Sequence, residues 1–259
     1  MKINSPQFNL MHRACMKASR VLIRDFGEIE KLQVSEKGPG DFVTASDKRV
    51  EKIIIGELEK SEYSILSEEA GFIEGKNKDK RWIIDPIDGT FNFLNGLPHF
   101  SISIACEEKS EITSGIVFDP IKNEMFFAEK GKGAYLNNSR IRVSNKSDFK
   151  NACLVTGGPK FTSKKREFIF QEYQKVSTEV RGHIRKFGSA ALDLAYVAAG
   201  RFDGCWQREI NYWDIAAGII LIRESGGFID SLNEGNFTQK KIDIIATNSK
   251  IHKELKNLL

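Results

Sequence analysis

The chain has no long apolar segment. No stretch approaches the roughly 20 apolar residues of a membrane span, and residues 1–6 lack the apolar centre of a signal peptide. The few cysteines stand far apart without a Cys-x-x-Cys pair, which is typical of reduced core residues. They are Cys15, Cys106, Cys153 and Cys205. We therefore expect a soluble, cytoplasmic protein with no membrane contact.

The sequence also lacks the motifs of several enzyme classes. It has no Gly-x-Ser-x-Gly motif, no Walker loop and no dinucleotide-binding glycine fingerprint. Its four histidines are scattered, without the spacing of metal ligands. The net charge of +4 comes from 39 basic and 35 acidic residues, with no single basic block. Binding to nucleic acid is therefore not indicated.

What is present is a chain of 259 residues with an ordinary composition, long enough to bury a full core. Apolar residues recur at helical spacing in residues 6–26 and 50–58, which predicts two amphipathic helices. A charged surface link is expected at residues 76–81. Alternating and apolar runs predict strands, most of them in an antiparallel meander with one face on the two helices. These strands are expected at residues 63–66, 82–85, 100–106, 112–118 and 125–128.

Polar residues 144–149 suggest a boundary between two halves of the chain. We therefore divide the chain into an N-terminal half, residues 1–145, and a smaller C-terminal half, residues 146–259. The second half alternates strands with helices, the last of them expected at residues 213–222. The predicted fold class is α+β or α/β: a layered sandwich of alternating helix and sheet layers, with an antiparallel-rich N-terminal sheet and a C-terminal α/β half.

The most informative segment is residues 82–90, Trp-Ile-Ile-Asp-Pro-Ile-Asp-Gly-Thr. Its apolar start indicates a buried strand, and Pro86, which cannot donate to a sheet ladder, predicts that this strand ends at Asp85. Asp85 and Asp88 can converge beyond the strand. Converging carboxylates repel one another unless a hard cation such as Mg²⁺, Mn²⁺ or Ca²⁺ binds them. Gly89 and Thr90 can offer backbone N–H groups to a phosphate.

Simpler roles stay open for three of the acidic residues. Asp88 and Gly89 could form only a hairpin turn, because Asp-Gly between apolar runs is a strong hairpin signal. Residues 91–96 lack the alternation of a returning strand, however, and favour a site loop. Asp47 and Asp214 each stand near the expected start of a helix, where an acid stabilises the first turn without any catalytic role.

Three separated blocks together resemble the inositol monophosphatase family of metal-dependent, lithium-sensitive phosphatases. They are Ser-Glu-Glu at residues 67–69, Asp-Pro-Ile-Asp-Gly-Thr at residues 85–90 and Trp-Asp at residues 213–214. The blocks stand in the family's order, and the similarity extends over nearly the whole chain. The haloacid dehalogenase signature, Asp-x-Asp-x-Thr, has one residue between its acids, whereas this chain has two. That spacing disfavours an aspartyl-phosphate mechanism.

The resemblance implies two or three Mg²⁺ ions per site, with Mn²⁺ as a substitute and Li⁺ as an inhibitor. It implies that one metal is held by Glu68, Asp85 and the Ile87 carbonyl, and that a second is held by Asp85, Asp88 and Asp214. It also implies that an aspartate works with a threonine to activate water, and these are Asp47 and Thr90 here. Lys37 stands one place later than the family's usual basic residue, and the sequence does not define its role.

On the substrate side, the resemblance implies that Gly188, Ser189 and Ala190 leave room for a polyol ring, beside a phosphate held at Gly89 and Thr90. The family's acid that reaches substrate hydroxyls stands seven places before the helix-start aspartate. Counting back from Asp214, which is itself expected on this side, gives the uncharged Gln207. The alternative for Gln207 is a surface residue at a strand end. Inositol monophosphate is the leading substrate.

Other functions stay open on the same fold. The substrate could be fructose bisphosphate, histidinol phosphate or a 3′-phosphonucleotide. A regulatory protein that binds RNA or another protein through its slightly basic surface is a further hypothesis, which the intact acids disfavour. Such a partner is compatible with the sequence but not indicated by it. The resemblance also implies a homodimer.

Overall fold

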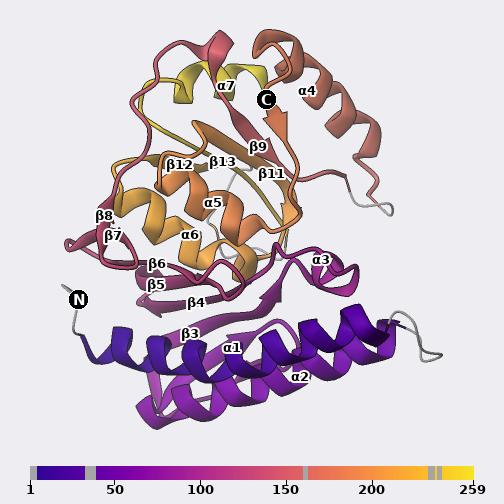
Figure 1. Ribbon diagram of the computed structural model, residues 1–259. Coiled ribbons are helices and arrows are strands. Elements are labelled where there is room, and N and C mark those ends of the chain that lie inside the picture. Colours follow the sequence, from indigo (N-terminus) through magenta and orange to yellow (C-terminus); the bar gives the residue numbers. More distant parts are fainter. Residues whose placement is uncertain (1–4, 33–38, 160–162, 233–236, 238–240) are drawn as a thin grey trace.

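The structure, a computed structural model, describes residues 5–32, 39–159, 163–232, 237 and 241–259. Helices and sheets alternate in five layers (Figure 1). One pair of long helices covers the outer face of the first sheet, a second pair lies between the two sheets, and a third pair covers the second sheet. The pairs are α1 (Pro6–Leu32) with α2 (Pro39–Leu58), α5 (Ala190–Ala198) with α6 (Tyr212–Glu224), and α4 (Arg166–Glu179) with α7 (His252–Leu258). The layered sandwich expected from the sequence is confirmed.

The first sheet has eight strands in the order β2-β1-β3-β4-β5-β6-β7-β8. Every neighbouring pair is antiparallel except β1 and β3, which are parallel. The predicted meander is therefore confirmed. The strands are β1 (Tyr63–Ser67), β2 (Gly71–Ile73), β3 (Asn77–Asp88), β4 (Ser101–Glu108), β5 (Glu111–Asp119), β6 (Glu124–Glu129), β7 (Gly133–Leu136) and β8 (Ser139–Ile141).

Both faces of this sheet are buried. Successive side chains of a strand point to opposite faces, so Ile84 and Phe127 pack towards α1 and α2, whereas Ile83 and Phe126 join the core that includes α5 and α6. Helix α6 approaches so closely that a Cβ added at Gly115 would lie 2.9 Å from the Ala217 Cα. The expected packing on the two N-terminal helices is thus present, and a second helix layer covers the other face.

The second sheet has the strand order β10-β9-β11-β13-β12 and mixes parallel with antiparallel pairs. Its strands are β9 (Leu154–Thr156), β10 (Ile184–Arg185), β11 (Gly204–Ile210), β12 (Phe228–Ser231) and β13 (Ile242–Thr247). Each sheet falls on one side of the boundary near residue 145. The core between the sheets nevertheless contains residues of both halves, Ile83 and Leu194 among them. The division into two domains stays a prediction.

Two expected element boundaries are wrong. Residues 77–81 do not form a surface link but the first part of β3, where Arg81 pairs with Glu107 of β4. Pro86 does not end that strand either. The chain bulges between Asp85 and Asp88, and pairing then resumes between Asp88 and Ser101. A bulge accommodates the missing proline N–H and re-aims the neighbouring side chains.

The start of α2 also differs from expectation. The helix begins at Pro39, a residue suited to a first helical position. Asp47 therefore lies about two turns inside the helix, where it cannot serve as a first-turn acid. Lys37 lies outside the described residues.

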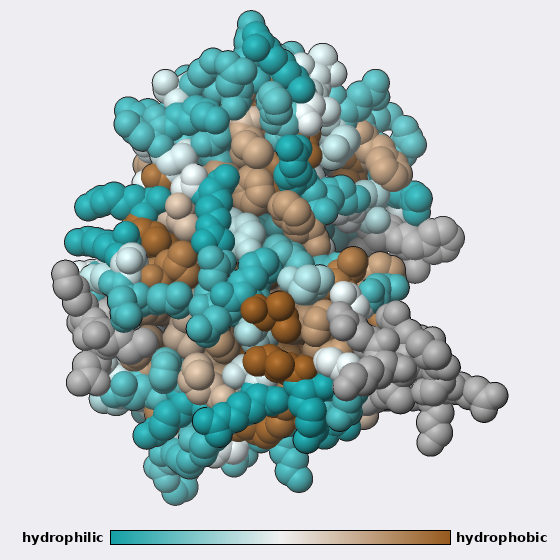
Figure 2. Space-filling model, viewed as in Figure 1, coloured by the Kyte–Doolittle hydropathy of each residue, from teal (hydrophilic) through white to brown (hydrophobic). Residues whose placement is uncertain are grey.

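Figure 2 shows a largely hydrophilic face with apolar side chains in several small patches. Among the helices of the described residues, none is long and apolar enough to cross a membrane. All four cysteines are free, and only Cys153 is not fully buried. This agrees with the reduced core residues expected from the sequence.

Candidate active site

The register of β1 against β3 brings two acidic segments together. The strands are parallel, and Ser67 at the end of β1 lies opposite Ile84 of β3. The backbone N–H of Glu68 donates to the Ile84 carbonyl oxygen at 3.2 Å. Glu68, the residue after β1, therefore lies beside Asp85 of β3, and their side chains share a hydrogen bond.

Asp85 lies at the centre of the acidic residues. It is fully buried, and its Oδ1 accepts the Ile87 N–H at 3.0 Å, which fixes the turn after Pro86. Burial and the charges of Glu68, Asp88 and Asp214 raise the pKa of Asp85 well above its ordinary value. Burial and the charge of Asp214 likewise raise the pKa of Glu68 to about 7.

Asp88 joins this segment to the C-terminal half. Its carboxylate accepts the hydroxyl of Ser189 and the backbone N–H groups of Ala190 at 3.3 Å and Ala191 at 2.9 Å. These groups form the start of α5, where the helix dipole favours a negative charge. Burial and the charge of Asp214 nevertheless raise the pKa of Asp88 to about 7. A residue that closed a simple hairpin would not make these contacts.

Asp214 lies in the first turn of α6. Its Oδ2 accepts the backbone N–H of Asn211 at 3.0 Å, so the capping role considered for it is present. The charge of Asp214 raises the pKa values of Glu68, Asp85 and Asp88. Asp214 therefore both caps α6 and belongs to the acidic cluster.

Asp47 reaches the same acids from α2. It is buried, and burial together with the charges of Glu69 and Glu68 raises its pKa to about 7. The hydroxyl of Thr90 donates to the Ile87 carbonyl at 2.8 Å. Among the hydrogen bonds of the described residues, none joins Asp47 to Thr90, so their cooperation stays a prediction.

The four acids Glu68, Asp85, Asp88 and Asp214 fit a hard cation by chemistry. The donors are all oxygens, and burial and the charges of neighbouring acids are the main causes that raise the pKa values of the first three. Within the described ranges, no three acidic, histidine or cysteine side chains surround a common point as metal ligands. Instead, Glu68 bonds to Asp85, and Asp88 bonds to the start of α5. A divalent cation would supply the missing positive charge.

Gly89 and Gly188 allow the two site segments to touch. Gly89 has φ +94°, and a Cβ there would lie 3.1 Å from the His99 carbonyl oxygen and 3.3 Å from that of Gly188. Any other residue type would be strained in this conformation and would press against both carbonyl groups. The phosphate-binding role expected of Gly89 and Thr90 stays a prediction.

Asn92 is a site residue that sequence reasoning missed. It lies in the short helix α3 (Thr90–Leu94), and its Nδ2 donates to the carbonyl oxygens of His99 at 2.7 Å and Phe187 at 2.6 Å. It thereby fastens the loop before Ser189 to the segment that carries Asp88. The available signal was an asparagine between two phenylalanines, a polar residue in an apolar context.

Gln207 is not a surface residue at a strand end. It is 6% exposed, lies within β11 opposite Ile244, and donates its Nε2 to Asp193 Oδ2 at 2.9 Å. Asp193, also missed, is buried in α5, and burial with the charge of Asp88 raises its pKa well above the ordinary value. Gln207 thus connects to the acidic residues through one buried carboxyl group.

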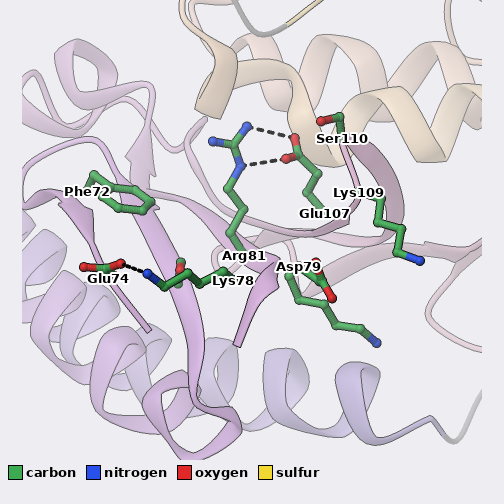
Figure 3. Close-up of a pocket in the computed structure, with 10 residues that line it drawn as sticks. Phe72, Glu74, Lys78, Asp79, Arg81, Glu107, Lys109 and Ser110 are labelled. Carbon is green, nitrogen blue, oxygen red and sulfur yellow. Dashed lines mark hydrogen bonds and ion pairs between the residues drawn. The ribbon is translucent and has the colours of Figure 1, made fainter. Parts of the chain in front are cut away.

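A separate cavity of about 360 Å³ lies beside the first part of β3. Figure 3 shows that Arg81 and Glu107 in its wall face one another, with Arg81 Nη2 donating to Glu107 Oε2 at 3.0 Å. The hydroxyl of Tyr212 also donates to Glu107, at 2.6 Å. This wall therefore anchors the start of α6, two residues before Asp214, and Arg81 and Glu107 are already paired with one another.

Similarity to known proteins over nearly the whole chain identifies the protein as a phosphoric monoester hydrolase. Residues 4–259 match the model of the inositol monophosphatase family, and the chain belongs to this family. Members of this family are metal-dependent and act on phosphorylated substrates.

The relatives carry two kinds of name. The chain is 45% identical to an inositol-1-monophosphatase of Rhizobium meliloti, over 98% of this chain and 96% of that one. It is 40% identical to a Nus factor SuhB of Pasteurella multocida, over 98% and 95%. A crystal structure of the extragenic suppressor protein suhB from Bartonella henselae has a TM-score of 0.89 and 45% identity, over 98% of both chains.

The raised pKa values predict how pH and metal affect stability. Without divalent metal, Glu68 and Asp88 of the folded protein stay protonated up to about pH 7. In the unfolded chain they lose their protons near the ordinary pKa values of glutamate and aspartate. The free energy of unfolding should therefore fall as pH rises through this window. Mg²⁺ binds the ionised acids, so it should raise Tm more at about pH 8 than at about pH 5.

Thermal unfolding in EDTA and in excess Mg²⁺ tests this. At a concentration 100 times the Kd, a bound ion adds about 2.7 kcal/mol to the free energy of unfolding. An equal Tm increase at both pH values would contradict the expectation.

Proposed function

We propose that the protein hydrolyses inositol monophosphate to inositol and phosphate with two or three Mg²⁺ ions, for which Mn²⁺ can substitute. The observation that carries this proposal is the cluster of buried acids: burial and the charges of neighbouring acids raise the pKa values of Glu68, Asp85 and Asp88, and Asp214 contributes to each of these shifts. The name inositol-1-monophosphatase of relatives at 44–45% identity supports the choice of substrate.

The ligands divide into two sets that share Asp85. Glu68, Asp85 and the carbonyl of Ile87 would hold the first metal ion, and Asp85, Asp88 and Asp214 would hold the second. When bound, such metal ions lower the pKa of an attacking water and stabilise the leaving oxygen. The Ile87 carbonyl already accepts one hydrogen bond from Thr90, and its second lone pair stays available.

Thr90 would orient the attacking water, and Asp47 would accept its proton. Because the Thr90 hydroxyl donates to the Ile87 carbonyl, its own oxygen is free to accept a hydrogen bond from water. Asp47, with a pKa of about 7, could take a proton at neutral pH. A general base works best when its pKa lies near the working pH.

The start of α5 and Gln207 would form the substrate side. Gly188, Ser189 and Ala190 lie beside Asp88, where small residues leave room for a polyol ring. Gln207 brings a neutral amide where the family typically has an acid, and it lies against Gly157. Hydrolysis of fructose bisphosphate, histidinol phosphate or a 3′-phosphonucleotide is the alternative within the same chemistry. Phosphate release from a panel of these esters distinguishes them.

A binding function is the second candidate, because relatives at 38–40% identity are named Nus factor SuhB. Such a function would act through the protein surface or a homodimer and would not need turnover. A protein inactivated at the acids should then keep its binding, whereas one that acts only as an enzyme loses all function.

The first test is Asp88→Asn. Asparagine has the same shape and keeps one oxygen for the Ala191 N–H, so the fold should persist, but a metal ligand is lost. Turnover of inositol monophosphate should fall at least about 10²-fold. Asp230→Asn, a change at an acid that pairs with Lys256 away from the site, is the matched control. Near-normal turnover by folded Asp88→Asn protein would refute the metal assignment.

Lithium should inhibit the enzyme. Li⁺ is close to Mg²⁺ in size but carries half its charge, so it can take the second position after the leaving group departs and delay phosphate release. We expect inhibition of the uncompetitive type. Titration with LiCl against KCl at equal ionic strength measures it, and equal rates in the two salts would disprove it.

Gln207→Glu tests the substrate side. A carboxylate here would repel a second anionic group, and polar contacts of this kind can change selectivity by a few kcal/mol. kcat/KM should fall more for a bisphosphate than for inositol monophosphate. An unchanged ratio between the two substrates would remove Gln207 from the substrate side.

A further inference from the structure

Glu51 is a buried acid of α2 that the proposed reaction does not use. It is 6% exposed and lies one helical turn after Asp47, on the same side of the helix. Its Oε1 accepts the Ser67 hydroxyl, the Ala70 N–H at 3.0 Å and the Glu69 N–H at 3.3 Å. One oxygen of Glu51 thus accepts hydrogen bonds from the last residue of β1 and from two residues of the turn that follows it.

These contacts enclose the metal ligand Glu68. On the sheet side, its backbone N–H donates to Ile84 of β3 at 3.2 Å. On the helix side, Glu51 holds Ser67 before it and the two residues after it. The backbone of Glu68 is therefore fixed from both directions, which aims its side chain at Asp85.

A carboxylate at this place has an electrostatic cost. The charge of Glu51 contributes to the raised pKa of Asp47 and thus opposes its ionisation. Packing α2 against the turn does not by itself require a negative charge. Two backbone N–H groups and a hydroxyl that converge on one point do require a strong acceptor.

We infer that Glu51 is a positioning residue: it holds the turn that presents Glu68 to the metal and couples this turn to Asp47 through α2. The inference rests on the proposed metal-dependent hydrolysis and adds a residue to it. Groups that orient metal ligands typically change metal affinity or activity about 10- to 100-fold when removed.

The same helix offers a matched control. Glu57 is 7% exposed and pairs with Lys17 and, at 2.8 Å, with Lys60. It is a buried acid of α2 like Glu51, but its partners are surface lysines and not the site turn. Its removal should lower Tm without changing the metal site.

The experiment compares wild type with Glu51→Ala, Glu51→Gln and Glu57→Ala. Calorimetric titration with Mn²⁺ gives the metal Kd, thermal unfolding gives Tm, and phosphate release at varied Mg²⁺ gives kcat and the Mg²⁺ requirement. Glu51→Ala should raise the Mn²⁺ Kd and the Mg²⁺ requirement about 10- to 100-fold, and saturating Mg²⁺ should restore much of kcat. Glu51→Gln keeps an acceptor oxygen and should rescue most of the affinity.

The outcomes separate the inference from the proposed function. A folded Glu51→Ala protein with wild-type Mn²⁺ affinity would overturn the positioning role. If Glu51→Ala does not fold, a loss of Mn²⁺ affinity of about 10- to 100-fold in folded Glu51→Gln, which keeps the acceptor oxygen, would overturn it as well. Wild-type protein that neither binds Mn²⁺ nor releases phosphate would instead refute the proposed function.

Discussion

The repulsion among buried carboxylates is the constraint on which the site depends. The parallel pairing of β1 with β3 sets Glu68 beside Asp85, and the bulge after Asp85 returns Asp88 to the same place. Burial then prevents water from screening these charges, so each acid raises the pKa of the others. A fold that selects such a cluster must hold it together by other contacts, and protons or cations must neutralise part of its charge.

Backbone N–H groups and buried side chains meet the first of these requirements. The start of α5 holds Asp88, Glu51 holds the turn around Glu68, and the contact of Tyr212 with Glu107 anchors the helix that carries Asp214. These supports come from helices and strands and not from long loops. Rigid elements keep charged groups in place better than loops do, which suits a site where small displacements are costly.

The local patterns of the sequence were sufficient for the helices, the meander and the acidic segments. They did not predict the roles of residues whose partners lie far away in the sequence. Asn92, Asp193 and Glu51 look unremarkable in sequence, because their roles arise from partners many positions away. The boundary at Pro86 was wrong because a bulge lets the ladder resume. The roles assigned to Gly89, Thr90 and the metal ligands depend on the family resemblance, since spacing alone also allowed a hairpin turn.

The distribution of charge across the site has a further consequence. One side of the site gathers Glu68, Asp85 and Asp88, whereas Gln207 and the buried Asp193 form an amide-to-carboxyl hydrogen bond on the other side. Burial and the charge of Asp88 raise the pKa of Asp193, whereas the hydrogen bond from Gln207 lowers it. An acid at position 207 would place a second carboxyl beside Asp193, and the two would have to share a proton or lose stability. The neutral amide of Gln207 therefore adds no negative charge to its side of the site. The acids stay concentrated on the opposite side, where a cation could compensate their charge.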